Sequence, residues 1–130
     1  VMAVNVTANW RLIRSLDPLL KRSDAGRAVF LTSGAVHRIR AYWGPYAVSK
    51  AALEAMVVTW ARECEITSIK ANLLNPGPLR TAMRAQAMPG EDADTLDRPG
   101  VLVPTVMRLL SPALEESGKV WNHPTGGWLA

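Results

Sequence analysis

Apolar residues form two kinds of pattern along this chain, and each kind predicts a different secondary-structure element. From residue 1 to about residue 22 they recur with the 3.6-residue period of an amphipathic helix, at Leu12, Ile13, Leu16, Leu19 and Leu20. Pro18 lies inside this segment. Because a proline removes a backbone hydrogen bond and crowds the preceding turn, we expect the helix to bend or change pitch between residues 16 and 18.

Two short apolar runs without polar alternation predict strands. The first covers residues 27–33 (RAVFLTS) between Gly26 and Gly34, and the second covers residues 69–75 (IKANLLN) and ends at Pro76. Such runs are typical of strands that are buried on both faces, as in a parallel sheet. We therefore expect both strands to lie inside the fold.

Helical patterns separate these strands and follow them. Pro45 suits the first turn of a helix over residues 45–65, and two shorter helices are predicted at residues 81–88 and 101–110. Residues 89–100 are rich in Asp, Pro and Gly and predict an exposed, mobile loop, and residues 118–122 predict a last strand. Alternating strands and helices favour the α/β class, with βαβ units and about three parallel strands.

Composition limits the protein to a small number of classes. The 130 residues suffice for one modest domain, and 48% hydrophobic with 20% charged residues is an ordinary globular composition. No apolar run approaches the roughly 20 residues that span a bilayer, and the first residues do not resemble a secretion signal. We expect a soluble, cytoplasmic protein without a membrane partner.

Charge, cysteine and histidine content exclude further classes. The net charge of +4 is mild, and basic residues do not cluster on one predicted face, so we expect no nucleic-acid partner. Cys64 is the single cysteine and falls in a helical pattern, where a buried thiol is the expected state and a reactive one the alternative. His37 and His123 have no partners at ligand spacing, so we expect no metal site.

Candidate chemistry gathers between residues 33 and 50. Tyr46 and Lys50 lie one helical turn apart, so their side chains share a face. A phenol titrates near pH ~10, and a nearby cation favours the phenolate, which makes the pair suitable for proton transfer. Ser33 stands at the end of the first predicted strand. The alternatives are a solvated Tyr–Lys pair and a serine that only caps a turn.

With Ser33, Tyr46 and Lys50 in this order, Asn-Pro-Gly at 75–77 and Gly-Lys-Val at 118–120, the chain resembles the short-chain dehydrogenase/reductase family. The resemblance covers essentially all 130 residues but only about the carboxyl-terminal half of the family fold. It implies the last part of a Rossmann-like, doubly wound parallel sheet, a single partial domain from which the amino-terminal βαβ units are absent.

The resemblance also implies catalytic roles for four residues. Tyr46 corresponds to the general acid/base that exchanges a proton with the substrate oxygen, and Lys50 to the cation that favours its phenolate. Ser33 corresponds to the residue that polarises the substrate oxygen. Asn5 matches the residue that helps to hold a water near the lysine; a local kink or an interhelical hydrogen bond is the alternative for this side chain.

The same resemblance implies a cofactor, NAD or NADP. Its nicotinamide ribose would contact Tyr46 and Lys50, and its carboxamide would meet the segment after the second predicted strand. The residues implied in that segment are Pro76, Gly77, Leu79 and Thr81. The loop at 89–100 would then be a substrate lid, with Met83 and Met88 beside an apolar pocket or, alternatively, filling the core.

The family's glycine-rich cofactor turn does not occur among the nine glycines of this chain. We therefore expect the carboxyl-terminal fragment of an NAD(P)-dependent oxidoreductase acting on a small alcohol or carbonyl compound, inactive by itself. The alternative is a truncated, inactive oligomerisation module. In both cases we expect a homo-oligomer built by helices 1–22 and 45–65. We also expect strand 27–33 to have an unpaired edge, which would pair with another copy of the chain or pack against a neighbouring molecule.

Overall fold

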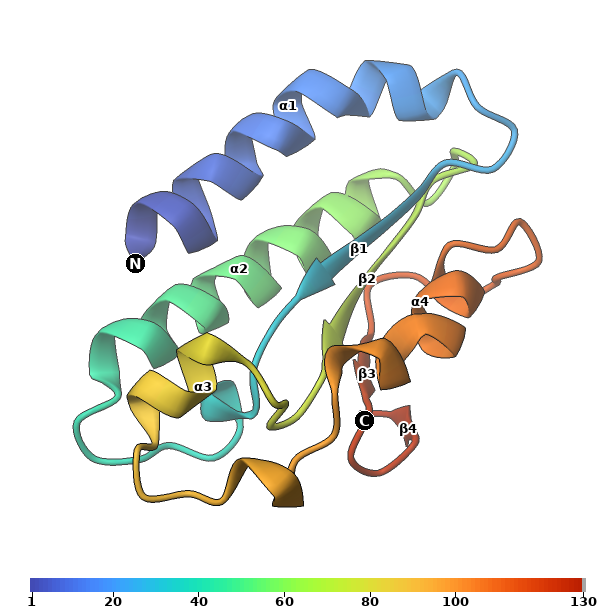
Figure 1. The fold of residues 1–130 in the computed structure, drawn as a ribbon. Helices are drawn as coiled ribbons and strands as arrows, with labels where there is room; N and C mark the ends of the chain where they lie inside the picture. The colour runs from blue at the N-terminus through green and yellow to red at the C-terminus, as the bar shows by residue number, and fades with distance from the viewer. Residues whose placement is uncertain (130) are drawn as a thin grey trace.

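A computed structural model describes residues 1–129 and contains a four-stranded sheet with helices on both faces (Figure 1). The strands are β1 (Arg27–Leu31), β2 (Lys70–Asn75), β3 (Val120–Asn122) and β4 (Gly127–Trp128). The α-helices are α1 (Ala8–Lys21), α2 (Gly44–Glu63), α3 (Ala82–Ala87) and α4 (Val103–Leu109). A π-helical turn, η1 (Ala3–Thr7), precedes α1, and three 3-10 turns are η2 (Gly34–Val36), η3 (Ala93–Thr95) and η4 (Pro99–Leu102). The predicted α/β class is confirmed.

The sheet is parallel over its first three strands and has the order β1-β2-β3-β4. Strand β1 pairs with β2 from Arg27↔Lys70 to Leu31↔Leu74, and β2 pairs with β3 in the same direction. Strand β4 runs antiparallel to β3. The expected parallel strands are confirmed, whereas β4 was not predicted because two residues are too short to form a pattern.

Helices cover the two faces because successive residues of β2 point to opposite sides. Ala71 and Leu73 belong to a core shared with α1 and α2, and Leu74 belongs to a second core shared with α4. All three side chains are fully buried. Burying a leucine side chain such as Leu73 or Leu74 contributes about 1.5–3 kcal/mol to stability, and β2 carries buried side chains on both of its faces.

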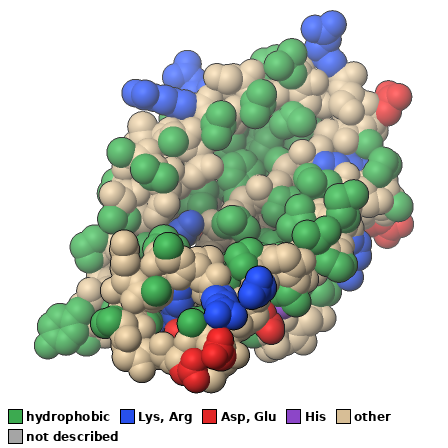
Figure 2. Space-filling model, viewed as in Figure 1, with side chains coloured by type: hydrophobic (Ala, Val, Ile, Leu, Met, Phe, Trp, Pro, Cys, Tyr) green, Lys and Arg blue, Asp and Glu red, His purple; other side chains and the backbone are tan. Residues whose placement is uncertain are grey.

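Strand β1 packs against both cores, through Ala28 and Phe30 on one face and Val29 on the other, but it is less buried than expected. Its first four residues are half-buried and Leu31 is 53% exposed. Among the described residues β1 has a strand neighbour on one side only, so the predicted unpaired edge is confirmed. Figure 2 shows hydrophobic side chains gathered in a recess of the surface over β1.

Near Pro18 the sequence predicted a bend or a change of pitch, and the change of pitch was wrong. The α-helix α1 continues through Pro18 to Lys21, and the irregular pitch lies at η1, near the start of the chain. A bend at Pro18 stays a prediction. Pro18 and Arg14 are both exposed, so the Arg14 carbonyl, which has lost its helical donor, is open to water.

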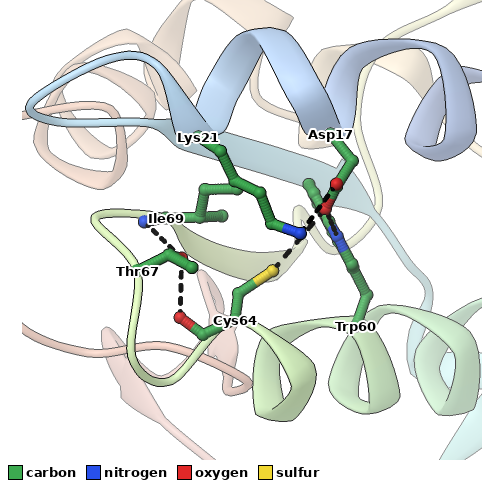
Figure 3. A network of polar contacts seen from close by, with 6 residues as sticks. All are labelled: Asp17, Lys21, Trp60, Cys64, Thr67 and Ile69. Carbon is green, nitrogen blue, oxygen red and sulfur yellow. Dashed lines mark hydrogen bonds and ion pairs between the residues drawn. The ribbon is translucent and has the colours of Figure 1, made fainter.

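A polar network joins α1 to the end of α2 (Figure 3). The indole N–H of Trp60 donates to Asp17 at 2.8 Å, and Lys21 forms an ion pair with the same carboxylate at 2.9 Å. Because of these two contacts, the hydrogen bond from Trp60 first, the pKa of Asp17 is lowered. The Cys64 thiol is buried here, 3.9 Å from the carboxylate, and burial raises the pKa of the thiol.

Candidate active site

The candidate residues lie at the carboxyl edge of the parallel strands (Figure 1). Ser33 follows β1, Pro76 and Gly77 follow β2, and the first turns of α2 carry Tyr46 and Lys50. Figure 1 shows the amino end of α2, the turn after β1 and α3 at this same end of the sheet. In open α/β sheets, ligands bind in the crevice outside the carboxyl ends of the strands.

Tyr46 and Lys50 share one face of α2, as their spacing predicts. The helix begins at Gly44 with a proline in its first turn, and Lys50 Nζ lies 6.0 Å from the centre of the Tyr46 ring. Trp43 also packs edge-on against this tyrosine, with ring centres 5.9 Å apart. The Tyr46 ring therefore has both an indole and a cation near it.

Lys50 is held at the end of β1. Its Nζ donates to the backbone oxygen of Leu31 at 2.9 Å, two residues before Ser33. Burial lowers the pKa of Lys50, because desolvation disfavours the charged ammonium. The same contact brings the cation next to the strand end that carries the serine.

Ser33 leaves β1 in an extended conformation and caps the turn η2. Its Oγ accepts a hydrogen bond from the backbone N–H of Ala35 at 3.1 Å. This contact matches the turn-serine interpretation, but it uses only an acceptor site of the hydroxyl. The hydroxyl hydrogen can still be donated to a substrate oxygen.

Asn5 lies in the π-helical turn and contacts α2. Its side-chain N–H donates to Ser49 Oγ at 3.0 Å, and that hydroxyl donates to the backbone oxygen of Tyr46 at 2.8 Å. The backbone oxygen of Asn5 accepts from the side chain of Asn9 at 2.9 Å. The interhelical hydrogen bond considered as the alternative is therefore present, and a role in holding a catalytic water stays a prediction. Ser49, fully buried, was not predicted as a site residue.

The segment after β2 is fixed by two asparagines. The side chain of Asn75 donates to Asn122 Oδ1 at 2.7 Å and accepts from the backbone N–H of Gly77 at 3.1 Å. Gly77 has a φ of +70°, a conformation that favours glycine. The motif Asn-Pro-Gly was recognised in the sequence, but the partner Asn122 on β3 was not.

Thr81 and Leu79 lie farther along this segment. Thr81 Oγ1 accepts from the backbone N–H of Arg84 and so caps α3, which leaves its hydroxyl hydrogen free to be donated. Leu79 forms an isolated bridge with Asp97, and the backbone N–H of Arg80 donates to Asp97 at 2.8 Å. The expected lid, residues 89–100, is therefore attached to the segment implied in cofactor binding.

Within residues 1–129, no group of three or more His, Cys, Asp or Glu side chains could hold a metal ion. In the same residues, no helix has the length and apolarity that crossing a membrane requires.

Comparison with known proteins identifies the family of this chain. A model of the enoyl-(acyl carrier protein) reductase family matches residues 1–100. The chain belongs to the short-chain dehydrogenase/reductase family. The oxidoreductase YciK of Escherichia coli K12 is 44% identical over 110 residues, which are 85% of this chain and 43% of that protein. The NADPH-dependent aldehyde reductase 2 of Arabidopsis thaliana is 35% identical over 83 residues, which are 64% of this chain and 30% of that protein.

Solved structures of short-chain dehydrogenases share the fold. One from Salmonella enterica serovar Typhi superimposes with a TM-score of 0.89 at 41% identity, over 94% of this chain and 51% of that one. One from Escherichia coli CFT073, in complex with NADPH, gives a TM-score of 0.88 at 41% identity and the same coverage. This chain spans about half the length of these relatives. The family and the Rossmann-like fold predicted from the sequence are confirmed.

The sequence did not predict three further residues beside the site, which are Thr32, His37 and Glu54. Thr32 Oγ1 donates to Glu54 Oε1 at 2.6 Å, and His37 Nε2 lies 3.3 Å from Glu54 Oε2. Glu54 is four residues after Lys50, so it continues the helix face that carries Tyr46 and Lys50. That spacing was the available signal, but nothing in the sequence pairs Glu54 with the turn after β1.

Proposed function

We propose that this chain is the proton-handling part of an NAD(P)-dependent oxidoreductase that interconverts an alcohol and a carbonyl compound. The observation that carries the proposal is the position of Lys50: it lies beside the Tyr46 ring and is bound to the end of β1, next to Ser33. The names of two relatives support it, because one structure is a complex with NADPH and one protein is an NADPH-dependent aldehyde reductase. A cytoplasmic location stays a prediction.

The donors at this edge fit the nicotinamide-ribose end of such a cofactor. Lys50 supplies a cation, and the hydroxyl hydrogens of Tyr46 and Thr81 are available to acceptors. The backbone of Pro76, Gly77 and Leu79 would complete the site for the carboxamide. When bound, the nicotinamide would supply or accept the hydride.

Proton transfer follows from the three side chains. In reduction, Tyr46 gives its phenolic proton to the substrate oxygen, and in oxidation it takes the proton back. Ser33 donates a hydrogen bond to the same oxygen, which stabilises the negative charge that develops there. Lys50 places a positive charge 6.0 Å from the Tyr46 ring, where it would stabilise the negative charge that develops on the phenol during proton transfer.

The pyrophosphate end of the cofactor has no corresponding donors here. A glycine-rich turn at a helix N-terminus is the usual pyrophosphate site, and no such turn occurs in the 130 residues. We therefore expect the isolated chain to bind dinucleotides weakly and to be inactive. Turnover assays require the full-length protein that contains these residues.

Tyr46→Phe in the full-length protein tests the proposal. We expect turnover of aldehydes and ketones with NADPH or NADH to be lost while cofactor binding, measured by calorimetry, is retained. Tyr42→Phe is the matched control, because Tyr42 lies four residues earlier, in the turn before α2, and is fully exposed. Substantial turnover by Tyr46→Phe would refute the proposed role.

A second function, self-association, is favoured by exposed apolar side chains on the first two helical segments. They are Val4, Trp10, Leu12, Leu16 and Leu19 before β1, and Val48 on α2. Helices with such faces bury them against another helix, and two copies related by a twofold axis would do so. The expected result is a dimer in sedimentation equilibrium, and a monomer at micromolar concentration would contradict it.

A further inference from the structure

One carboxylate holds both ends of the turn that carries Ser33. Glu54 Oε1 accepts from the hydroxyl of Thr32 at 2.6 Å, and Glu54 Oε2 lies 3.3 Å from His37 Nε2. Thr32 immediately precedes Ser33, and His37 is the residue that ends the 3-10 turn η2. The two contacts therefore enclose the whole turn.

Burial makes the contact with Thr32 stronger than a surface contact. The Glu54 side chain is only 13% exposed and Thr32 is buried, whereas the His37 side chain is 48% exposed. A carboxylate so far removed from water needs hydrogen-bond partners, and charge-assisted hydrogen bonds are stronger than neutral ones. Both oxygens of Glu54 have a partner, so the carboxylate is fixed in place together with the residues that it contacts.

The same face of α2 fixes the strand end just before the turn. Lys50, one helical turn before Glu54, binds the backbone oxygen of Leu31. Residues 31, 32 and 37 are thus attached to the helix that carries Tyr46, on either side of Ser33. The turn between them has its own hydrogen bonds, such as the one from His37 N–H to the Gly34 oxygen at 3.1 Å.

We propose that Glu54 is a positioning residue that sets the Ser33 hydroxyl relative to the Tyr46 phenol. The inference rests on the proposed function, in which both hydroxyls meet one substrate oxygen. Two groups that act on the same atom must keep a fixed separation, and a small misplacement lowers the rate steeply. Glu54 supplies that constraint by joining the serine turn to the tyrosine helix.

A double-mutant cycle in the full-length protein tests the role. We expect Glu54→Ala to lower kcat on the order of 10- to 100-fold, with little change in KM for the cofactor. In a Ser33→Ala background the same substitution should have little further effect, because the hydroxyl that it positions is already absent. Glu63→Ala is the matched control, since Glu63 is an exposed carboxylate at the end of the same helix. Its kcat should equal that of the wild type.

Milder variants keep the test decisive if Glu54→Ala does not fold. Thr32→Val removes one of the two contacts and should lower kcat, whereas Thr32→Ser keeps the hydroxyl and should restore it. Equal activity of these two variants would overturn the inference. An Ala substitution at Glu54 that reduces kcat by the same factor with and without Ser33 would overturn it as well, because Glu54 would then act through something else.

Hydrogen exchange separates this inference from the proposed function. If the wild type turns over no carbonyl or alcohol substrate, the proposed function fails, and the amide exchange of residues 34–38 still decides what Glu54 does. We expect faster exchange of this turn in Glu54→Leu, which removes both oxygens, and unchanged exchange in Glu63→Ala. An unchanged turn in Glu54→Leu would show that Glu54 does not hold Ser33 in place.

Discussion

The ammonium of Lys50 lies 6.0 Å from the centre of the Tyr46 ring while it donates to the Leu31 backbone oxygen at 2.9 Å. One side chain therefore connects the phenol-bearing helix to the end of β1. The cost of this position is desolvation, which lowers the pKa of Lys50. A half-buried cation with a single backbone acceptor fits the role proposed for Lys50 beside Tyr46.

We predict that Lys50→Met lowers the rate of alcohol oxidation. The substitution removes the positive charge 6.0 Å from the Tyr46 ring and the hydrogen bond that joins α2 to the Leu31 backbone oxygen. Lys50→Arg retains the charge and should keep more of the activity than Lys50→Met. Measurements of kcat/KM in the full-length protein decide this, and equal values for Lys50→Met and wild type would contradict the role.

We also predict a stability difference between the wild type and Lys50→Met that depends on pH. The pKa of Lys50 is lower in the folded than in the unfolded state, so the charged form costs stability below the folded pKa. That cost should diminish as pH rises from the folded pKa toward the ordinary value of about 10.4. The free energy of unfolding of the wild type should therefore rise relative to that of the variant over this alkaline range, as urea titrations would measure.

The sequence predicted those parts of the site that depend on local geometry. The Tyr46–Lys50 spacing predicts a shared helix face, whatever else the chain does. The contact of Glu54 with Thr32 joins residues 22 positions apart, and no local pattern signals such a pair. The unpaired edge of β1 was predicted, but the exposure of its side chains was not, because apolar content shows that a strand can be buried and does not show how completely the flanking helices cover it.

The carboxylate that joins the first two helices provides a stability prediction. We expect Asp17→Ala to lower the free energy of unfolding by about 1–3 kcal/mol, because the buried indole N–H of Trp60 loses its acceptor. Asp24→Ala is the control: Asp24 is exposed, and its loss should change stability by less than about 0.5 kcal/mol. Urea unfolding of the three proteins gives the comparison. Equal stabilities of the two variants would contradict a structural role for the Asp17–Trp60 contact.

The Asp17 contact should also make stability depend on pH. Its folded pKa is lowered, so its contribution is complete above the unfolded value near 3.9 and is lost as pH falls through the folded pKa. The difference in free energy of unfolding between wild type and Asp17→Asn should therefore shrink below about pH 4. A difference that stays constant from pH 7 to pH 2 would show that the charge of Asp17 is not involved.

An ion pair holds the expected lid to α3, and we predict that breaking it loosens the lid. Arg84 contacts both oxygens of Glu91 at 2.9 Å, and the pKa of Glu91 is lowered by this hydrogen bonding. In Glu91→Gln we expect faster amide exchange over residues 89–100 and a higher KM for the substrate of the full-length protein. Glu115→Gln, which removes an exposed carboxylate after α4, should change neither. Unaltered exchange in Glu91→Gln would show that the β-bridge between Leu79 and Asp97 and the hydrogen bond from the Arg80 N–H hold residues 89–100 without the ion pair.

Two glycines with the same backbone conformation allow the steric contact in the segment after β2 to be measured separately from backbone strain. Gly77 and Gly126 have φ angles of +70° and +68°, but only at Gly77 would an added Cβ meet another group, Pro124 Cγ at 2.7 Å. Gly126→Ala should cost about 1 kcal/mol of backbone strain, whereas Gly77→Ala should cost at least about 2 kcal/mol because a steric clash adds to the strain. Urea unfolding measures both. If the clash moves the segment that contains Leu79 and Thr81, Gly77→Ala should also weaken cofactor binding by the full-length protein, and Gly126→Ala should not. If the two substitutions lower the free energy of unfolding equally, Pro124 moves away from the added Cβ at no cost, and this contact does not fix the segment.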